Sequence, residues 1–197
     1  MSTKKTRRRV IQSAVAVGAA GLMFAATAMP AAATSTKPVE DVIPALAAPQ
    51  TVADTAPSTI NLDVLGVEAA DLRSLGSDDV ADYWVARSGN EDVCLITYIR
   101  GGNEVASSAC VSIADFYRTG VGILTGESRD DPSRATEAYL FPADVDAGAV
   151  TQSGDARRSA TTGSQFIASR PGDIDFAPTT LTRADGSAFA FSPIRGR

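Results

Sequence analysis

The two cysteines of this 197-residue chain constrain its fold more than any other feature, because the residues between them predict how they pair. Residues 101–103 read Gly-Gly-Asn, which is typical of a three-residue hairpin loop and sets Arg100 opposite Glu104. Counting outward along both strands brings Cys94 directly opposite Cys110. Directly paired residues of antiparallel strands have Cα atoms about 4.5 to 5.5 Å apart, within reach of a disulfide. The sequence therefore predicts a hairpin closed by a structural disulfide, without the Cys-x-x-Cys spacing of redox motifs.

Seven of the twelve aromatic residues lie between positions 83 and 141, which locates the hydrophobic core there. Ser112, with Asp115 three residues later, resembles a capping box and predicts a short helix that ends at Gly120. A second small helix or turn is expected within residues 64–75. The fold class expected is α+β or mostly β, with a small antiparallel sheet. About five strands are predicted from short apolar runs between turn residues, at 83–86, 93–99, 105–110, 121–125 and 138–141.

Composition divides the remainder of the chain into flanking segments. Residues 34–58 contain four prolines and no aromatic residue, which predicts a disordered Pro/Ala/Thr-rich tether. Residues 59–142 are expected to form the small globular domain with the disulfide. Residues 143–197 are rich in Gly, Ser and Arg, with short apolar islands at 165–168 and 188–194. This C-terminal segment is expected to be partly ordered at most, or to add edge strands.

The N-terminus has the pattern of an export signal. Five basic residues at positions 4–9 precede a long uncharged stretch that ends in Ala-Ala-Ala at 31–33, so residues 1–33 are predicted to be a cleaved signal peptide. Residues 6–12, Thr-Arg-Arg-Arg-Val-Ile-Gln, resemble a twin-arginine export signal, and the general secretory route is the alternative. The expected location is extracellular or in the cell envelope. If the signal is not cleaved, residues 10–29 would instead anchor the protein in a membrane.

The charge of the chain argues against two classes of partner. Its formal net charge is −5, but residues 34–197 hold 13 basic and 23 acidic residues. An acidic domain of this kind is a poor partner for nucleic acid or for an anionic membrane surface.

The chain lacks the residues that several kinds of catalysis require. The chain contains no histidine, which excludes Ser-His and Cys-His catalysis and imidazole-bound metals. Lys37 is the one lysine after the predicted signal and lies in the predicted tether, outside any domain that could hold a Ser-Lys dyad. Residues 120–126, Gly-Val-Gly-Ile-Leu-Thr-Gly, do not match the dinucleotide fingerprint and are interpreted as a strand flanked by glycines. The segment around Ser128, Gly-Glu-Ser-Arg-Asp at 126–130, begins like a nucleophile elbow. It lacks the final glycine of that motif and is therefore interpreted as a loop.

Carboxylates are the remaining candidates for chemistry. Two carboxylates about 5 to 9.5 Å apart can cleave a glycosidic bond, which leaves a carboxylate-based hydrolase as an alternative. A calcium loop starting at Asp144 would have Ala149 where glycine is needed, so the acids are interpreted mainly as solvated turns. We predict no catalytic, cofactor-binding or metal-binding residue and no cofactor. The clustered acids are Asp78, Asp79, Asp82, Asp130, Asp131, Asp144, Asp146 and Asp155.

The order of short motifs resembles a family of proteins. Tyr-Trp-Val-Ala-Arg at 83–87, Val-Cys-Leu-Ile at 93–96, Ser-Ala-Cys at 108–110 and Gly-Val-Gly-Ile at 120–123 are similar to small exported, disulfide-containing proteins of unknown function from high-GC Gram-positive bacteria. The resemblance covers about residues 65–140 and implies no site residue. We expect an exported, non-catalytic module that binds an envelope component or another extracellular protein. The alternatives are the hydrolase and a membrane-anchored extracytoplasmic sensor or regulator.

Overall fold

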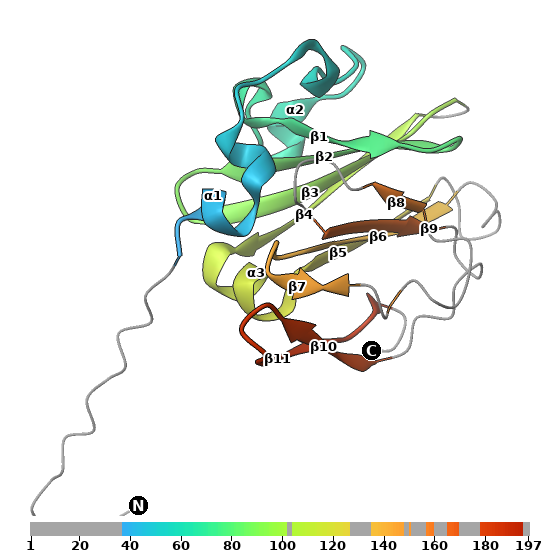
Figure 1. The fold of residues 1–197 in the computed structure, drawn as a ribbon. Coiled ribbons are helices and arrows are strands. Elements are labelled where there is room, and N and C mark those ends of the chain that lie inside the picture. Colours follow the sequence, from blue (N-terminus) through green and yellow to red (C-terminus); the bar gives the residue numbers. More distant parts are fainter. Residues whose placement is uncertain are drawn as a thin grey trace, which may run out of the picture. The chain divides into compact units, whose positions relative to one another are not determined.

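The computed structural model of the chain describes residues 37–101, 104–126, 135–147, 150, 157–159, 165–169 and 178–194. Within these ranges the fold is mostly β, with three antiparallel sheets and a few short helices, so the expected class is confirmed and there are more strands than predicted (Figure 1). The first sheet has the order β1 (Arg73–Ser77), β2 (Ala81–Ser88), β3 (Asp92–Ile99), β4 (Val105–Ser112). The second has the order β5 (Val121–Gly126), β6 (Ala135–Phe141), β9 (Gln165–Ser169), β8 (Arg157–Ser159). The third has the order β11 (Ala188–Phe191), β10 (Thr179–Arg183), β7 (Val145–Asp146).

The helices are short and lie mainly before the first sheet. The N-terminal ones are α1 (Val39–Val42), η1 (Pro44–Ala47), η2 (Val52–Asp54), α2 (Leu62–Leu65) and η3 (Ala69–Asp71). The predicted helix after the hairpin is α3 (Ile113–Thr119), where the Ser112 hydroxyl accepts a hydrogen bond from the backbone N–H of Asp115. The C-cap of α3 is Gly120, as predicted, with φ +69°.

The hairpin of β3 and β4 has the predicted register. Cys94 pairs with Cys110, and the pairing continues without a shift from Asp92–Ser112 to Ile99–Val105. The two cysteines form a disulfide with a Cα–Cα distance of 4.0 Å. Closing a loop of this length stabilises a fold by about 3 kcal/mol in the chain-entropy model.

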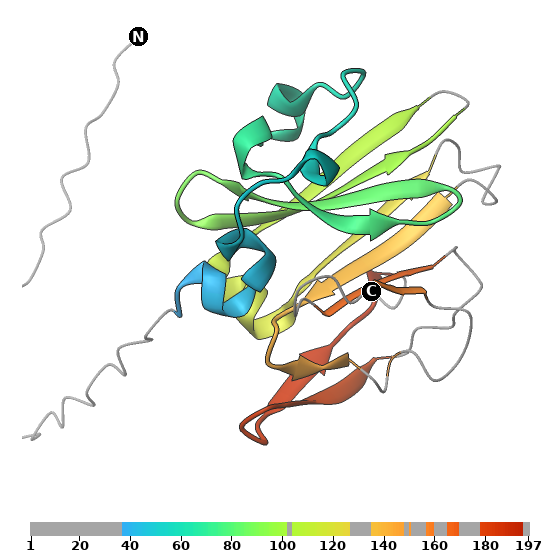
Figure 2. The same cartoon turned by 45° about the horizontal axis from the view of Figure 1, so that its top comes forward.

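The two inner strands of the first sheet, β2 and β3, are buried on both faces. Successive residues of a strand point to opposite faces, so Val85 and Leu95 pack toward the second sheet while Trp84 and Ile96 pack under the segment of residues 56–72. In Figures 1 and 2 this teal segment lies on one side of the green strands, and the orange and red strands lie on the other. Burial on two faces explains why β3 is an almost continuous apolar run.

The glycine-rich residues 120–126 form strand β5, as interpreted from the sequence. Gly122 pairs with Tyr139 of β6, and a Cβ at position 122 would lie 2.6 Å from the Tyr139 ring. This glycine is therefore needed so that the Tyr139 ring can lie against the neighbouring strand.

The predicted disordered tether at 34–58 is wrong for its described residues, 37–58. Val39, Val42 and Ile43 are buried in the same core as Val85 and Leu95. The prolines do not prevent packing, because Pro44 occupies the first turn of η1, where a missing N–H costs nothing. Short helices thus present the few apolar side chains of this segment to one end of the core.

The predicted domain boundary at residue 142 is also wrong. β9 lies between β6 and β8 in the second sheet, so the C-terminal segment supplies an inner strand as well as edge strands. The two apolar islands form β9 and β11, and Phe189 and Phe191 alternate into a second core with Tyr139 and Phe141. The described C-terminal strands are therefore part of the domain, because β9 and β8 extend the second sheet and β7, β10 and β11 cover its other face.

The packing of the N-terminal segment gives a direct test. Replacing Ile43, which has no exposed surface, with alanine is expected to lower the free energy of unfolding by about 2 to 5 kcal/mol. The control is Val52→Ala in the same segment, because Val52 is 91% exposed and its truncation should change stability by less than about 0.5 kcal/mol. Urea unfolding of both variants measures the difference. Equal stability of the two variants would show that residues 37–58 do not pack in solution.

Candidate functional site

Two of the acids singled out from the sequence meet at the beginning of β2, but their contacts are structural. One oxygen of Asp78 accepts hydrogen bonds from two backbone N–H groups of the following turn at 2.7 and 2.8 Å, and the other accepts from the Tyr83 hydroxyl at 2.8 Å. Asp82 forms an ion pair of 3.6 Å with Arg100. Burial raises the pKa of Asp82; Arg100 opposes this effect and Asp78 adds to it. Because both oxygens of Asp78 accept hydrogen bonds within the fold and Asp82 is paired with Arg100, neither carboxylate of this pair is free of structural contacts.

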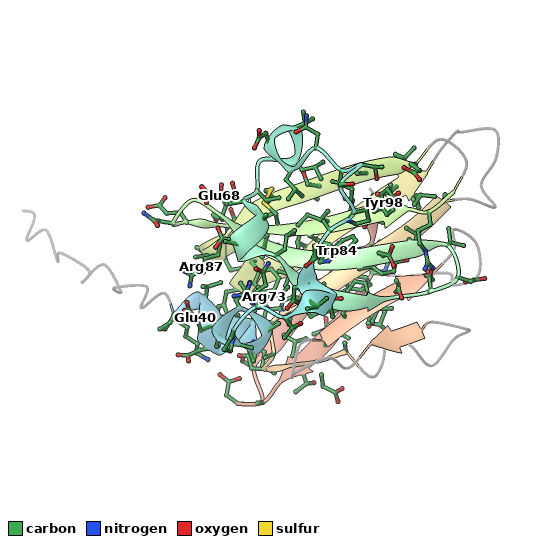
Figure 3. All side chains as sticks on the ribbon, turned by 90° about the horizontal axis from the view of Figure 1, so that it is seen from above. Glu40, Glu68, Arg73, Trp84, Arg87 and Tyr98 are labelled. Carbon is green, nitrogen blue, oxygen red and sulfur yellow. A yellow bond between two sulfur atoms is a disulfide. The ribbon has the colours of Figure 1, made fainter. Side chains whose placement is uncertain are left out.

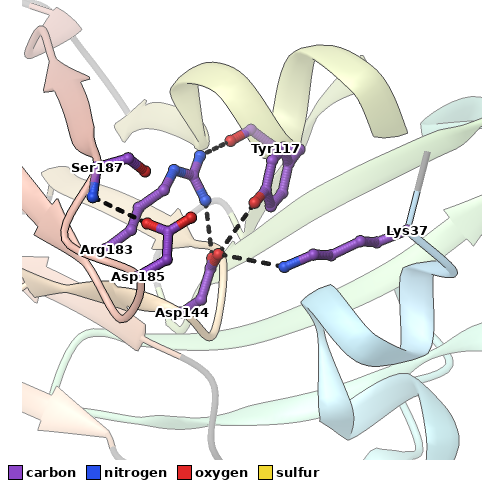
Figure 4. A network of polar contacts seen from close by, with 6 residues as sticks. All are labelled: Lys37, Tyr117, Asp144, Arg183, Asp185 and Ser187. Atoms are coloured by element: carbon purple, nitrogen blue, oxygen red, sulfur yellow. Dashed lines mark hydrogen bonds and ion pairs between the residues drawn. The ribbon is translucent and has the colours of Figure 1, made fainter. Parts of the chain in front are cut away.

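Asp144 lies at the centre of a polar cluster that joins three distant parts of the chain (Figure 4). Arg183 donates to one of its oxygens at 2.8 Å, while the Tyr117 hydroxyl donates to the other at 3.1 Å. Lys37 lies 3.6 Å from the carboxylate. The Arg183 guanidinium also donates to the Tyr117 carbonyl and stacks 4.0 Å from the centre of the Tyr117 ring. Asp144 thus connects the N-terminal segment, α3 and β10.

The remaining predicted acids are not gathered into a site. Asp79 is exposed, and Asp146 lies on β7 in the third sheet. Asp130, Asp131 and Asp155 lie outside the described residues, as do Ser128 and the rest of the considered calcium loop at 151–155. Among the residues that the structure places, no three potential ligands are grouped so that they could hold a metal ion.

Asp54 is a buried carboxylate that the sequence analysis missed. It accepts hydrogen bonds from the backbone N–H and hydroxyl of Thr51 at 2.6 and 2.8 Å, and from the backbone N–H of Ser74 in β1 at 2.6 Å. Burial alone would raise its pKa, but these hydrogen bonds and nearby Arg73 lower the pKa of Asp54 below its usual value. The spacing Thr51-x-x-Asp54 is a capping-box pattern, which could have revealed this N-terminal helical turn.

A surface hollow of about 450 Å³ lies between the turn that follows β2 and the segment of residues 63–71. Its lining includes three acidic residues and one basic residue, together with two glycines: Asp63, Glu68, Asp71, Arg87, Gly66 and Gly89. Figure 3 labels Glu68 and Arg87, which lie on the same side of the molecule, with Glu40 beside Arg87. The hollow brings charged groups together from segments that are separate in sequence, so neither segment alone indicated a site.

The three acids of the hollow differ from Asp54, Asp78 and Asp144 in their contacts. Within the part of the chain that the structure describes, the side chains of Asp63, Glu68 and Asp71 make no hydrogen bond or ion pair. Arg87 is half-buried and forms an ion pair with Glu40 of α1. The floor includes Val67, which is buried in the same apolar cluster as Trp84 and Cys94. The hollow therefore combines a packed base with acidic side chains that the fold leaves unused.

Comparison with known proteins finds no matching family model, no similar curated protein and no similar solved structure. The disulfide favours an oxidising, extracytoplasmic location. Residues 1–33, including the predicted signal and the alternative anchor at 10–29, lie outside the described residues. No helix in the described ranges is long and apolar enough to cross a membrane.

The contacts of Asp54 predict a pH-dependent contribution to stability. Because the folded pKa of Asp54 is lowered, its contribution is fully present above the ordinary aspartate pKa of about 4 and is lost as pH falls through the folded value. At pH 7 we expect Asp54→Asn to destabilise the fold by about 1 to 3 kcal/mol, since hydrogen bonds to a charged acceptor are lost. This difference from the parent should shrink between pH 5 and pH 2, as measured by urea unfolding. Asp63→Asn is the control and should show neither effect, whereas a pH-independent difference for Asp54→Asn would contradict the interpretation.

The cluster around Asp144 predicts that its buried arginine contributes to the free energy of unfolding and that a surface arginine contributes little. The Arg183 side chain is 7% exposed, and Arg183→Met removes an ion pair and a cation–π contact, which should cost about 3 kcal/mol. Arg118→Met is the matched control, because the Arg118 side chain is 71% exposed in its pair with Asp115 and should contribute less than about 0.5 kcal/mol. Thermal unfolding measures both. A small loss for Arg183→Met would mean that the C-terminal sheet is held by apolar packing alone.

Proposed function

We propose that this protein is an exported, non-catalytic module that binds an envelope component or another extracellular protein through the hollow lined by Asp63, Glu68, Asp71 and Arg87. The observation that carries the proposal is the set of three acids in this hollow, which have no structural partner among the described residues. The buried acids elsewhere are used to hold turns and segments together. Charged side chains that the fold does not need are available for a ligand.

The lining of the hollow favours a partner with positive charge. Carboxylates accept strong hydrogen bonds from ammonium and guanidinium groups, and an acidic surface increases the rate at which a cationic partner arrives. Arg87, whose guanidinium pairs with Glu40, also lines the hollow. A protein segment rich in lysine or arginine, or an envelope polymer that bears amino groups, has the required chemistry.

The two alternatives from the sequence have less support. A hydrolase would need a carboxylate pair with one free base, but Asp78 has both oxygens engaged and Asp144 is held by Arg183 and Tyr117. The membrane-anchored sensor depends on residues 10–29, which lie outside the described residues. Export itself and the resemblance to exported proteins of high-GC Gram-positive bacteria stay predictions.

A pull-down from envelope extract tests the proposal. Residues 34–197 serve as bait in three forms: the parent, the hollow variant Glu68→Gln/Asp71→Asn, and the control variant Asp41→Asn/Glu104→Gln. Both variants remove one Glu and one Asp charge, and all four positions are exposed or half-buried. Because each hydrogen bond to a charged group contributes about 1.5 to 3 kcal/mol, the hollow variant should retain the partner at least about tenfold less well than the parent and the control. Equal retention by all three baits would contradict the assignment of the hollow as the binding site.

A further inference from the structure

The two sulfurs of the disulfide lie in different environments. Cys94 belongs to the central strand β3, has no exposed surface and packs with Trp84 and Ile96. Cys110 belongs to β4 at the edge of the first sheet, and it is the one exposed residue of that strand. A reagent in solution can therefore reach Cys110 while the fold is intact, whereas Cys94 is covered.

The backbone pattern shows that the bridge spans a non-hydrogen-bonded pair. Glu91 and Ile113 are the next pair after Asp92–Ser112 in the same register. They form a hydrogen-bonded pair, because the N–H of Ile113 donates to the carbonyl of Glu91. Hydrogen-bonded and non-hydrogen-bonded pairs alternate in an antiparallel ladder, so the even-numbered residues of β4 point their backbone groups away from β3. The Cα–Cα distance of 4.0 Å agrees with a non-hydrogen-bonded pair. No described strand of the first sheet pairs with β4 on its outer side.

The surroundings of each cysteine decide which sulfur a thiolate can attack. Thiol–disulfide exchange proceeds by attack of a thiolate on one sulfur in line with the bond that breaks. Cys110 lies on the edge strand β4, and no described strand lies beyond it. Cys94 lies between β4 and β2, where Ala86 is its direct partner and is fully buried. A thiolate can therefore approach Cys110 from the open edge of the sheet, whereas buried neighbours block its approach to Cys94.

We infer that Cys110 is the site at which this disulfide exchanges with an external disulfide or thiol, and that Cys94 is the resolving cysteine. In the closing direction, the Cys110 thiolate attacks an external disulfide, forms a mixed disulfide and releases one external thiolate. The Cys94 thiolate then attacks the Cys110 sulfur, forms the internal bond and releases the second external thiolate. The chain loses two electrons and two thiol protons, and the external disulfide gains the two electrons. Opening is the reverse reaction with two external thiols, so the partner class is a protein or small molecule with a reactive disulfide or dithiol.

Single-cysteine variants test the inference with cystamine as the external disulfide. Cys94→Ser keeps the thiol at position 110, and Cys110→Ser keeps the one at position 94. In native buffer the Cys94→Ser variant should form the mixed disulfide at least about tenfold faster, because a buried thiol reacts only after local opening. In about 8 M urea, which unfolds most domains, the two variants should form the mixed disulfide at similar rates. Equal rates in native buffer, or faster modification of the Cys110→Ser variant, would overturn the inference.

A measurement on the unaltered protein covers the case in which a single-cysteine variant does not fold. The oxidised protein is treated briefly with cysteamine, the free thiols are alkylated, and the protein is cleaved after Arg100, which separates the two cysteines. The expected products carry cysteamine on Cys110 and the alkyl group on Cys94. Cysteamine on Cys94 would overturn the inference, and so would a disulfide that opens only at denaturant concentrations that unfold the protein.

Discussion

The burial of the β2–β3 hairpin on both faces is the constraint on which the other parts of the structure depend. A sheet with two apolar faces needs a cover on each side, because exposed apolar surface is costly in water. The second sheet covers one face and residues 56–72 cover the other. The second sheet then has an outer face of its own, with Tyr139 and Phe141, and the third sheet covers it. The order of layers therefore follows from successive apolar faces.

Carboxylates help to hold the covering segments in place. Asp54 ties the N-terminal segment to the edge strand β1 through the backbone N–H of Ser74. Asp144 ties Lys37 and α3 to β10 through Arg183 and Tyr117. Buried or half-buried acids with several donors are stabilised in the charged form, and this explains why an acidic chain can use them inside its fold. The acids around the hollow are different, since their side chains have no such partners among the described residues.

The hollow and the disulfide share one apolar cluster. Val67 forms part of the floor of the hollow and packs in the same cluster as Cys94, and Figure 3 shows the yellow disulfide on the side of the molecule where Glu68 is labelled. A packed base of this kind fixes the backbone from which the acidic side chains extend, so a ligand need not order that backbone on binding. The hollow and the buried end of the bridge therefore share apolar packing, while Cys110 is exposed at the edge of β4.

Features that depend on neighbouring residues could be predicted from the amino-acid sequence. The pairing of Cys94 with Cys110 follows from counting outward from a three-residue turn, and α3 follows from the cap at Ser112, because hairpin register and helix capping are local. That residues 37–58 and the C-terminal strands belong to the domain is visible only in the folded protein. Their few apolar side chains are too sparse to indicate burial, and they become buried because distant strands leave open faces for them. The roles of the acids were decided in the same way, since a carboxylate holds the fold or stays free according to donors that lie far away in the sequence.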